Sequence, residues 1–249
     1  MVLVIRTVFA LITVACVCFL TSFYSSSSQG DIIKPGTPKQ RQTRMLKILS
    51  LGDSYTIGRG LQQTESWPVQ LAAQLRKDKI EIDTPVIIAA TGWTTTDLLM
   101  AIANSNLKEP YDLVTLLVGA NDQFQGFGEY AYSAGFEKLL ISAIDLAGDR
   151  PSRVIVISIP DYSVTKFGKQ FSPAKIKAAI ENFNIVNKRL AREKGVYYVN
   201  VTEISRRVAE DVTFLAPDGL HPSAKMYAEW VNLIRPVVLE ALGIENYNN

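Results

Sequence analysis

Cysteine and histidine are both scarce in this chain of 249 residues. The two cysteines, Cys16 and Cys18, lie in one apolar stretch near the start, so the rest of the chain has no thiol from which to build a disulfide framework. The single histidine, His221, excludes zinc sites that need two or three imidazoles or a Cys/His cluster. Carboxylates alone can hold Mg or Ca, but no D-x-D-x-D-G ligand loop occurs. We therefore expect no metal and no other cofactor.

Excess charge of one sign is also missing. The chain has 26 basic and 24 acidic residues, a net charge of +2, which gives no surplus for a surface that follows a phosphate backbone. Nucleic acid is therefore not expected as the main partner. Hydrophobic residues make up 47% of the sequence and charged residues 20%, a globular composition with enough apolar material for a substantial core. The length suits one large domain.

A long uncharged stretch lies near the start of the sequence. Between Thr7 and Tyr24 there is no charged residue, and residues 8–20 read VFALITVACVCFL after Arg6. We interpret residues 1–24 as a targeting segment, which places the protein outside the cytoplasm: secreted, periplasmic or membrane-anchored. Its length lies between the apolar core of a secretory signal and the ~20 residues of a spanning helix. A cleaved signal is favoured over a retained anchor, which would associate the protein with a membrane, and both are favoured over a lipoprotein acylated at Cys16.

Residues 25–44 have a different composition. They read SSSSQGDIIKPGTPKQRQTR, without an apolar period, and predict a flexible tether before a single domain at residues 45–249. The basic residues of this tether follow the apolar segment instead of preceding it. That order is opposite to the positive-inside preference and argues against simple export.

The predicted domain alternates short β-branched runs with longer helical patterns. Strands are predicted at 46–51, 85–90, 113–118, 154–159 and 196–201, and helices at 67–77, 95–103, 130–147, 173–194 and 223–242. Apolar strands joined by helices long enough to cross over are typical of a parallel sheet covered on both faces. The predicted fold is a three-layer α/β/α sandwich with a mostly parallel sheet of about five strands.

Polar groups follow three of these strands and precede the last helix, and in a parallel sheet ligands bind beyond the carboxyl ends of the strands. The four segments are Gly52-Asp53-Ser54, Thr91-Gly92-Trp93, Gly119-Ala120-Asn121-Asp122 and Asp218-Gly219-Leu220-His221-Pro222. Taken singly, each has an ordinary structural explanation as a helix cap, a turn or a packed histidine. Together they supply a hydroxyl nucleophile, an imidazole base three residues after an aspartate, and donors for an oxyanion, which are the parts of serine hydrolysis.

These four segments, in this order, resemble the four blocks of the SGNH (GDSL-type) hydrolase family, over residues 46–242. The stretch Glu65-Ser66-Trp67-Pro68 is similar to the bacterial periplasmic thioesterase and lysophospholipase branch. The GxSxG elbow of α/β-hydrolases is absent.

The resemblance implies a role for each matching residue. Ser54 would be the nucleophile, His221 the general base and then acid, and Asp218 the group that orients the imidazole. The oxyanion hole would use the backbone N–H groups of Ser54 and Gly92 and the side-chain amide of Asn121. A glycine at position 92 permits close backbone approach, and an Asn amide is a donor whose charge does not change with pH.

Two further groups of residues are left open by the sequence. Asp53 and Asp122 are expected to bond backbone N–H groups and hold the catalytic loops in shape, with a paired-carboxylate glycosidase as a remote alternative. Aromatic and apolar residues follow the third and fourth strands. They fit an acyl pocket and ordinary loop packing equally well: Phe124, Phe127, Tyr130, Tyr162, Val164, Phe167 and Phe171.

The predicted function is cofactor-independent hydrolysis of a carboxylic ester through an acyl-enzyme. An acyl ester, such as a lysophospholipid, a short acyl ester or a thioester, is favoured as the substrate over an acetylated carbohydrate. A non-catalytic binding module that has kept the fold is the remote alternative. The sequence gives no indication of the oligomeric state.

Overall fold

The computed structural model describes residues 44–107 and 110–244. The predicted targeting segment and almost all of the predicted tether lie outside the described residues, as do Cys16 and Cys18. Among the described residues, no helix combines the length and the apolar character that crossing a membrane requires.

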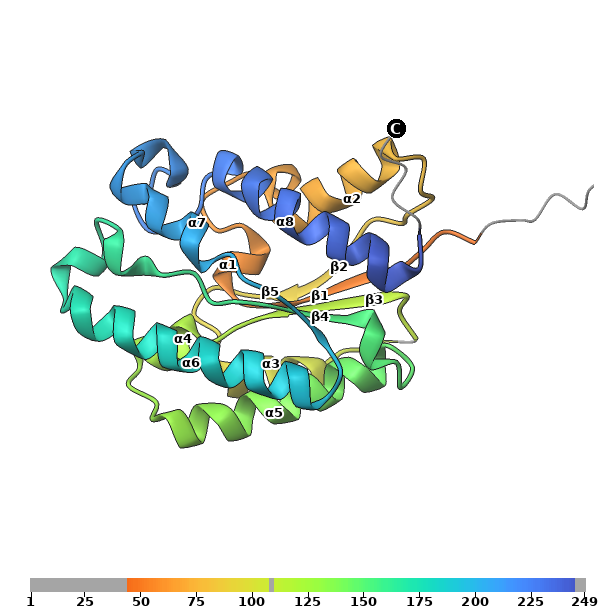
Figure 1. The fold of residues 1–249 in the computed structure, drawn as a ribbon, viewed down its shortest axis with the longest axis horizontal. Coiled ribbons are helices and arrows are strands. Elements are labelled where there is room, and N and C mark those ends of the chain that lie inside the picture. Colours follow the sequence, from red (N-terminus) through yellow and green to blue (C-terminus); the bar gives the residue numbers. More distant parts are fainter. Residues whose placement is uncertain (1–43, 108–109, 245–249) are drawn as a thin grey trace, which may run out of the picture. The chain divides into compact units, whose positions relative to one another are not determined.

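Five parallel strands form the central sheet, in the order β2-β1-β3-β4-β5 (Figure 1). Their bounds are β1 Ile48–Gly52, β2 Val86–Ala89, β3 Leu113–Leu117, β4 Val154–Ile157 and β5 Tyr197–Val199. Every residue of β1, β3 and β4 is buried, because these strands lie inside the sheet with helices on both faces. The chain moves from β1 to one edge and then back across to β3, so the connections diverge at β1 and β3. This divergence opens a crevice at the carboxyl ends of these two strands.

Helices cover both faces of the sheet. In the view of Figure 1, α2 and α8 lie side by side above it, and α3, α5 and α6 lie below it. The helix bounds are α1 Ser54–Ile57, α2 Trp67–Lys77, α3 Thr95–Asn104, α4 Ala120–Phe124, α5 Glu129–Leu146, α6 Pro173–Glu193, α7 Thr202–Arg206 and α8 Ala224–Leu242. The prediction of a three-layer α/β/α fold with about five mostly parallel strands is therefore confirmed.

Large side chains fill the core on both sides of the sheet. Trp67 of α2 and Trp230 of α8 have no exposed surface, and on the other side Tyr132 stacks on Phe183 with ring centroids 3.8 Å apart. Burying a large aromatic side chain stabilises a fold by roughly 2–3 kcal/mol, so these contacts hold the helices firmly against the sheet. The sheet edge beneath the crevice is therefore a rigid support.

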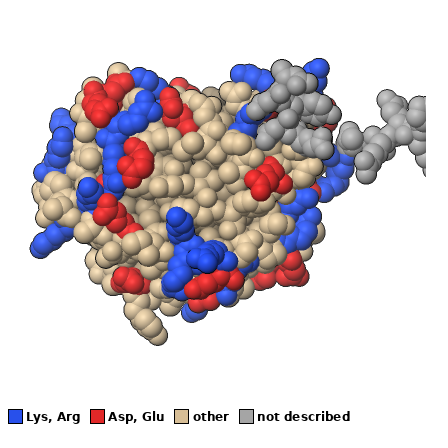
Figure 2. Space-filling model, viewed as in Figure 1, with Lys and Arg blue, Asp and Glu red and all other residues tan. Residues whose placement is uncertain are grey.

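Charges of both signs are mixed on the face drawn in Figure 2. Lys and Arg side chains are interspersed there with Asp and Glu side chains, and a tan uncharged area lies between them. That face therefore carries no uniform field of one sign.

Candidate active site

A close turn at the end of β1 presents Ser54. A Cβ at Gly52 would lie 2.1 Å from Thr56 Oγ1 and 2.5 Å from the Leu117 carbonyl oxygen, so only glycine lets β1 end this close to β3. Asp53 then caps α1, its Oδ1 accepting the backbone N–H of Tyr55 at 2.9 Å. The turn thereby fixes Ser54 at the carboxyl edge of the sheet, in the crevice between β1 and β3.

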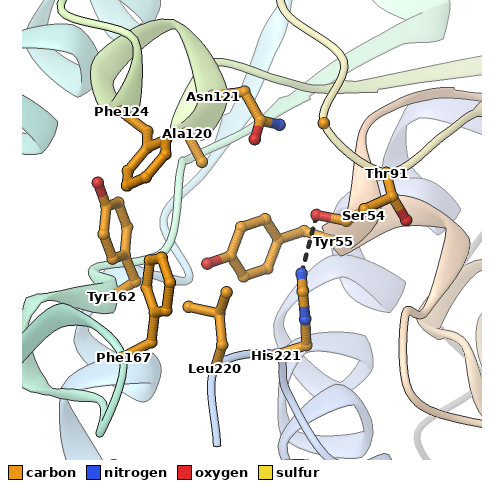
Figure 3. Close-up of a pocket in the computed structure, with 11 residues that line it drawn as sticks. Ser54, Tyr55, Thr91, Ala120, Asn121, Phe124, Tyr162, Phe167, Leu220 and His221 are labelled. Carbon is orange, nitrogen blue, oxygen red and sulfur yellow. Dashed lines mark hydrogen bonds between the residues drawn. The ribbon is translucent and has the colours of Figure 1, made fainter. Parts of the chain in front are cut away.

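Ser54 meets two residues that lie more than 160 positions further along the chain. The Ser54 Oγ is 2.9 Å from His221 Nε2 (Figure 3), and His221 Nδ1 is 2.7 Å from Asp218 Oδ2. Ser54 and His221 are both more than nine-tenths buried, and both line the same pocket. The structure therefore brings together the three residues that the sequence predicts to act together.

Asp218 is fixed by backbone donors as well as by the imidazole. Its Oδ1 accepts the N–H groups of Leu220 and His221, at 3.0 and 2.9 Å. Although partial burial opposes ionisation, these bonds and the His221 ring lower the pKa of Asp218 overall. An ionised carboxylate only accepts hydrogen bonds, so His221 Nδ1 carries a hydrogen and Nε2 is left to accept the Ser54 hydroxyl proton.

The predicted oxyanion donors surround the same pocket. Ser54, Gly92 and Asn121 all line it. One hydrogen of the Asn121 amide is donated to the Trp93 carbonyl oxygen at 3.0 Å, and the other is available for a substrate, since the group has two. Gly92 has φ +86° and open space where a Cβ would stand. Its left-handed backbone, which other residues rarely adopt, is therefore a second reason for glycine beside the close approach predicted from the sequence.

Two buried carboxylates, those of Asp53 and Asp122, hold the catalytic loops in place through hydrogen bonds. Asp53 caps α1, and Asp122 ties the third segment to the start of α3, because it accepts the Thr95 N–H at 3.0 Å and the Thr95 hydroxyl at 2.6 Å. The expected bonds to backbone N–H groups are confirmed. Burial raises the pKa of Asp53 to about 7; the bond from Tyr55 opposes this rise and the nearby Asp122 adds to it. Burial also raises the pKa of Asp122, against its bonds from Thr95. Neither carboxylate lines the pocket.

The pocket itself is small and mostly apolar. It encloses about 150 Å³, and aromatic side chains stand on the side away from Ser54 and His221 (Figure 3). Of the residues that the sequence left open, Phe124, Tyr162 and Phe167 line this pocket. Phe171 packs against Phe124 and Phe167 at 5.5 and 5.2 Å from their ring centroids. Phe127, Tyr130 and Val164 are not among the lining residues.

Sequence reasoning missed four lining residues, Tyr55, Thr91, Ala120 and Leu220. Thr91, Ala120 and Leu220 lie inside the four segments without an assigned role, and Tyr55 directly follows the first segment. Which neighbours face the pocket depends on the local backbone and not on residue type. Within residues 44–107 and 110–244, no group of three or more His, Cys, Asp or Glu side chains is placed to hold a metal ion.

The model of the GDSL-like Lipase/Acylhydrolase family matches residues 50–229, which span all four segments. An arylesterase of Vibrio mimicus is 26% identical over 179 residues, which cover 71% of this chain and 80% of that protein. Among solved structures, TesA is similar with a TM-score of 0.62 and 19% identity, covering 79% of this chain and 99% of that one. The acetylxylan esterase Axe2 of Geobacillus stearothermophilus is similar with a TM-score of 0.59 and 20% identity, covering 80% of this chain and 95% of that one.

Proposed function

This chain belongs to the GDSL-like lipase/acylhydrolase family, and from that premise we propose that it cleaves acyl esters through an acyl-enzyme on Ser54. It is an ester hydrolase of this family. The observation that carries the proposal is the continuous chain of hydrogen bonds from Ser54 through His221 to Asp218. No other side chain is needed to move a proton between the nucleophile and the leaving group.

In the first half of the reaction, Ser54 Oγ attacks the ester carbonyl carbon and its proton passes to His221 Nε2. Asp218 stabilises the imidazolium that forms. The N–H groups of Ser54 and Gly92 and the free hydrogen of the Asn121 amide bind the oxyanion. The bond to the leaving oxygen then breaks, and His221 returns the proton to that oxygen. In the second half, water takes the place of Ser54 and repeats the same steps, which releases the acid.

The pocket favours an acyl ester over an acetylated carbohydrate. Phe124, Tyr162, Phe167 and Leu220 present carbon surface to whatever enters, and such surface stabilises a hydrocarbon chain by roughly 25 cal/mol per Å² removed from water. An acetyl group is too short to cover more than a small part of that surface. A lysophospholipid, a short acyl ester and a thioester all share the favoured acyl group.

The cellular location is a second part of the proposal. The uncharged stretch between Thr7 and Tyr24 supports an extracytoplasmic enzyme, either released or held at a membrane by that segment. Its support is the sequence alone.

A fluorophosphonate probe tests the nucleophile directly. We expect it to label the wild-type protein and not Ser54→Ala, while Ser142→Ala, on α5 and away from the pocket, is labelled like the wild type. Labelling of Ser54→Ala would refute the assignment. A series of p-nitrophenyl esters of increasing chain length, run beside acetylated xylan, tests the substrate class. A preference for the polysaccharide would overturn the acyl-ester assignment while leaving the nucleophile in place.

A further inference from the structure

The hydroxyl of Tyr55, a residue that lines the pocket, takes no part in the proposed chemistry. This residue follows the nucleophile, and only 4% of its surface is exposed. Figure 3 shows its ring crossing the pocket, with the hydroxyl directed toward the end where Tyr162, Phe167 and Leu220 stand. Within the part of the chain that the structure describes, this hydroxyl forms no hydrogen bond, although the backbone carbonyl of Tyr55 accepts one from the Tyr227 hydroxyl at 2.9 Å.

The other tyrosine of the pocket behaves differently. The Tyr162 hydroxyl donates to Gln123 Oε1, so it already has its partner. The Tyr55 hydroxyl opens into the pocket and receives no hydrogen bond from the described residues, so its partner is water or a bound ligand. Tyr55 and Tyr162 therefore differ within one pocket. The Tyr162 hydroxyl is bonded to a protein side chain, whereas the Tyr55 hydroxyl can bond to a substrate.

From this juxtaposition we infer that Tyr55 selects substrates whose acyl chain carries an oxygen atom, to which its hydroxyl donates a hydrogen bond. The inference rests on the proposed acyl-enzyme at Ser54 and names the acyl group more closely. His221 must protonate the leaving oxygen, so the leaving group lies on its side of the pocket. The acyl chain therefore extends toward the aromatic end, where the Tyr55 hydroxyl lies.

Two features make the hydroxyl an effective selector. Burial raises the pKa of Tyr55 well above its ordinary value, so the group remains a neutral donor throughout the working range of the enzyme. The walls around it are carbon, so a plain hydrocarbon chain at that depth would displace water from the hydroxyl and leave it without a partner. An oxygenated chain replaces that water with an equivalent bond.

The test uses four p-nitrophenyl esters of equal chain length. One is the hexanoate, and in the other three an oxygen replaces carbon 3, 4 or 5 of the acyl chain. Each kcat/KM is divided by the alkaline hydrolysis rate of the same ester, which removes differences in intrinsic reactivity. The proteins are the wild type, Tyr55→Phe and Tyr162→Phe. The Tyr55→Phe change keeps the ring that packs 5.2 Å from the imidazole of His221 and removes only the hydroxyl.

In the wild type, we expect at least one oxygen-containing ester to exceed the hexanoate by about tenfold in normalised kcat/KM. This ratio should fall to about one in Tyr55→Phe and stay at the wild-type value in Tyr162→Phe. Because each ratio is taken on one preparation, a change in the folded fraction cancels. A wild type without preference, or a Tyr55→Phe ratio within twofold of the wild type for all three esters, would overturn the inference. An equal fall in Tyr162→Phe would overturn it too.

The ester series and the fluorophosphonate probe separate this inference from the proposed function. If the wild type is labelled at Ser54 and shows no preference among the four esters, the role of Tyr55 is wrong and the acyl-enzyme stands. If Ser54→Ala is labelled like the wild type, the proposed function is wrong, and the inference fails with it.

Discussion

The buried carboxyl group of Asp53 makes the stability of this protein depend on pH in an unusual direction. The folded protein keeps the Asp53 proton up to about pH 7, whereas the unfolded chain releases it near pH 3.8. Between these values the folded state holds more protons, so the stability present at low pH is lost as the pH rises through this window. From pH 5 to pH 8, the two pKa values give a loss of about 2–3 kcal/mol in the free energy of unfolding from this one group.

Asp53→Asn isolates this contribution. The amide oxygen can still accept the Tyr55 N–H and cap α1, while the titrating group is gone. Among the residues that the structure describes, the second carboxylate oxygen, Asp53 Oδ2, has no hydrogen-bond partner, so the new amide nitrogen would also lack one. That cost is the same at every pH and cancels in the comparison.

Urea unfolding followed by tryptophan fluorescence measures the effect, since Trp67 and Trp230 are fully buried. We expect the wild type to lose about 2–3 kcal/mol more than Asp53→Asn between pH 5 and pH 8. Asp145→Asn, on the exposed surface of α5, is the control and should follow the wild type. Parallel losses in the wild type and in Asp53→Asn would refute the reasoning.

Two further predictions concern catalysis and the start of the chain. Asn121→Ala should lower kcat by about 10²–10³ with little change in KM, because one oxyanion donor is lost, and steady-state kinetics on a p-nitrophenyl ester measure it. An effect on KM alone would make Asn121 a residue that binds substrate. Removal of residues 1–30 should leave a soluble and active hydrolase, since the catalytic segments begin at Gly52; size-exclusion chromatography with an ester assay on each peak decides it. Aggregation or loss of activity would show that this segment packs against the domain.

Long apolar patterns made most of the fold predictable from the sequence. The predicted helix at 67–77 coincides with α2. Four of the predicted strands each contain the observed one, and the strand predicted at 46–51 overlaps β1, which begins two residues later and ends one residue later. The short helices α1, α4 and α7 were not predicted. Four or five residues are too few to show a helical period, and each of these helices begins within three residues of the end of a strand.

The identity of the site residues could also be predicted from the sequence, but their contacts could not. The resemblance of four segments pointed to Ser54, Gly92, Asn121, Asp218 and His221, and all five line the pocket or bond to a residue that does. The contacts between the segments could not be predicted from the sequence. The bond from the Asn121 amide to the Trp93 carbonyl and the ties from Thr95 to Asp122 depend on how two strand exits lie side by side. No spacing in the sequence encodes the direction of the Tyr55 ring.

The long separation between Ser54 and His221 bears on how the enzyme is made. A protein is synthesised from its N-terminus, so the nucleophile and all three oxyanion donors are made long before the imidazole. The segment from Asp218 to His221 can take its place only once α8, which directly follows it and packs against α2, is there to hold it. A growing chain therefore lacks the general base of the proposed reaction until synthesis has passed His221, however early Ser54 is made.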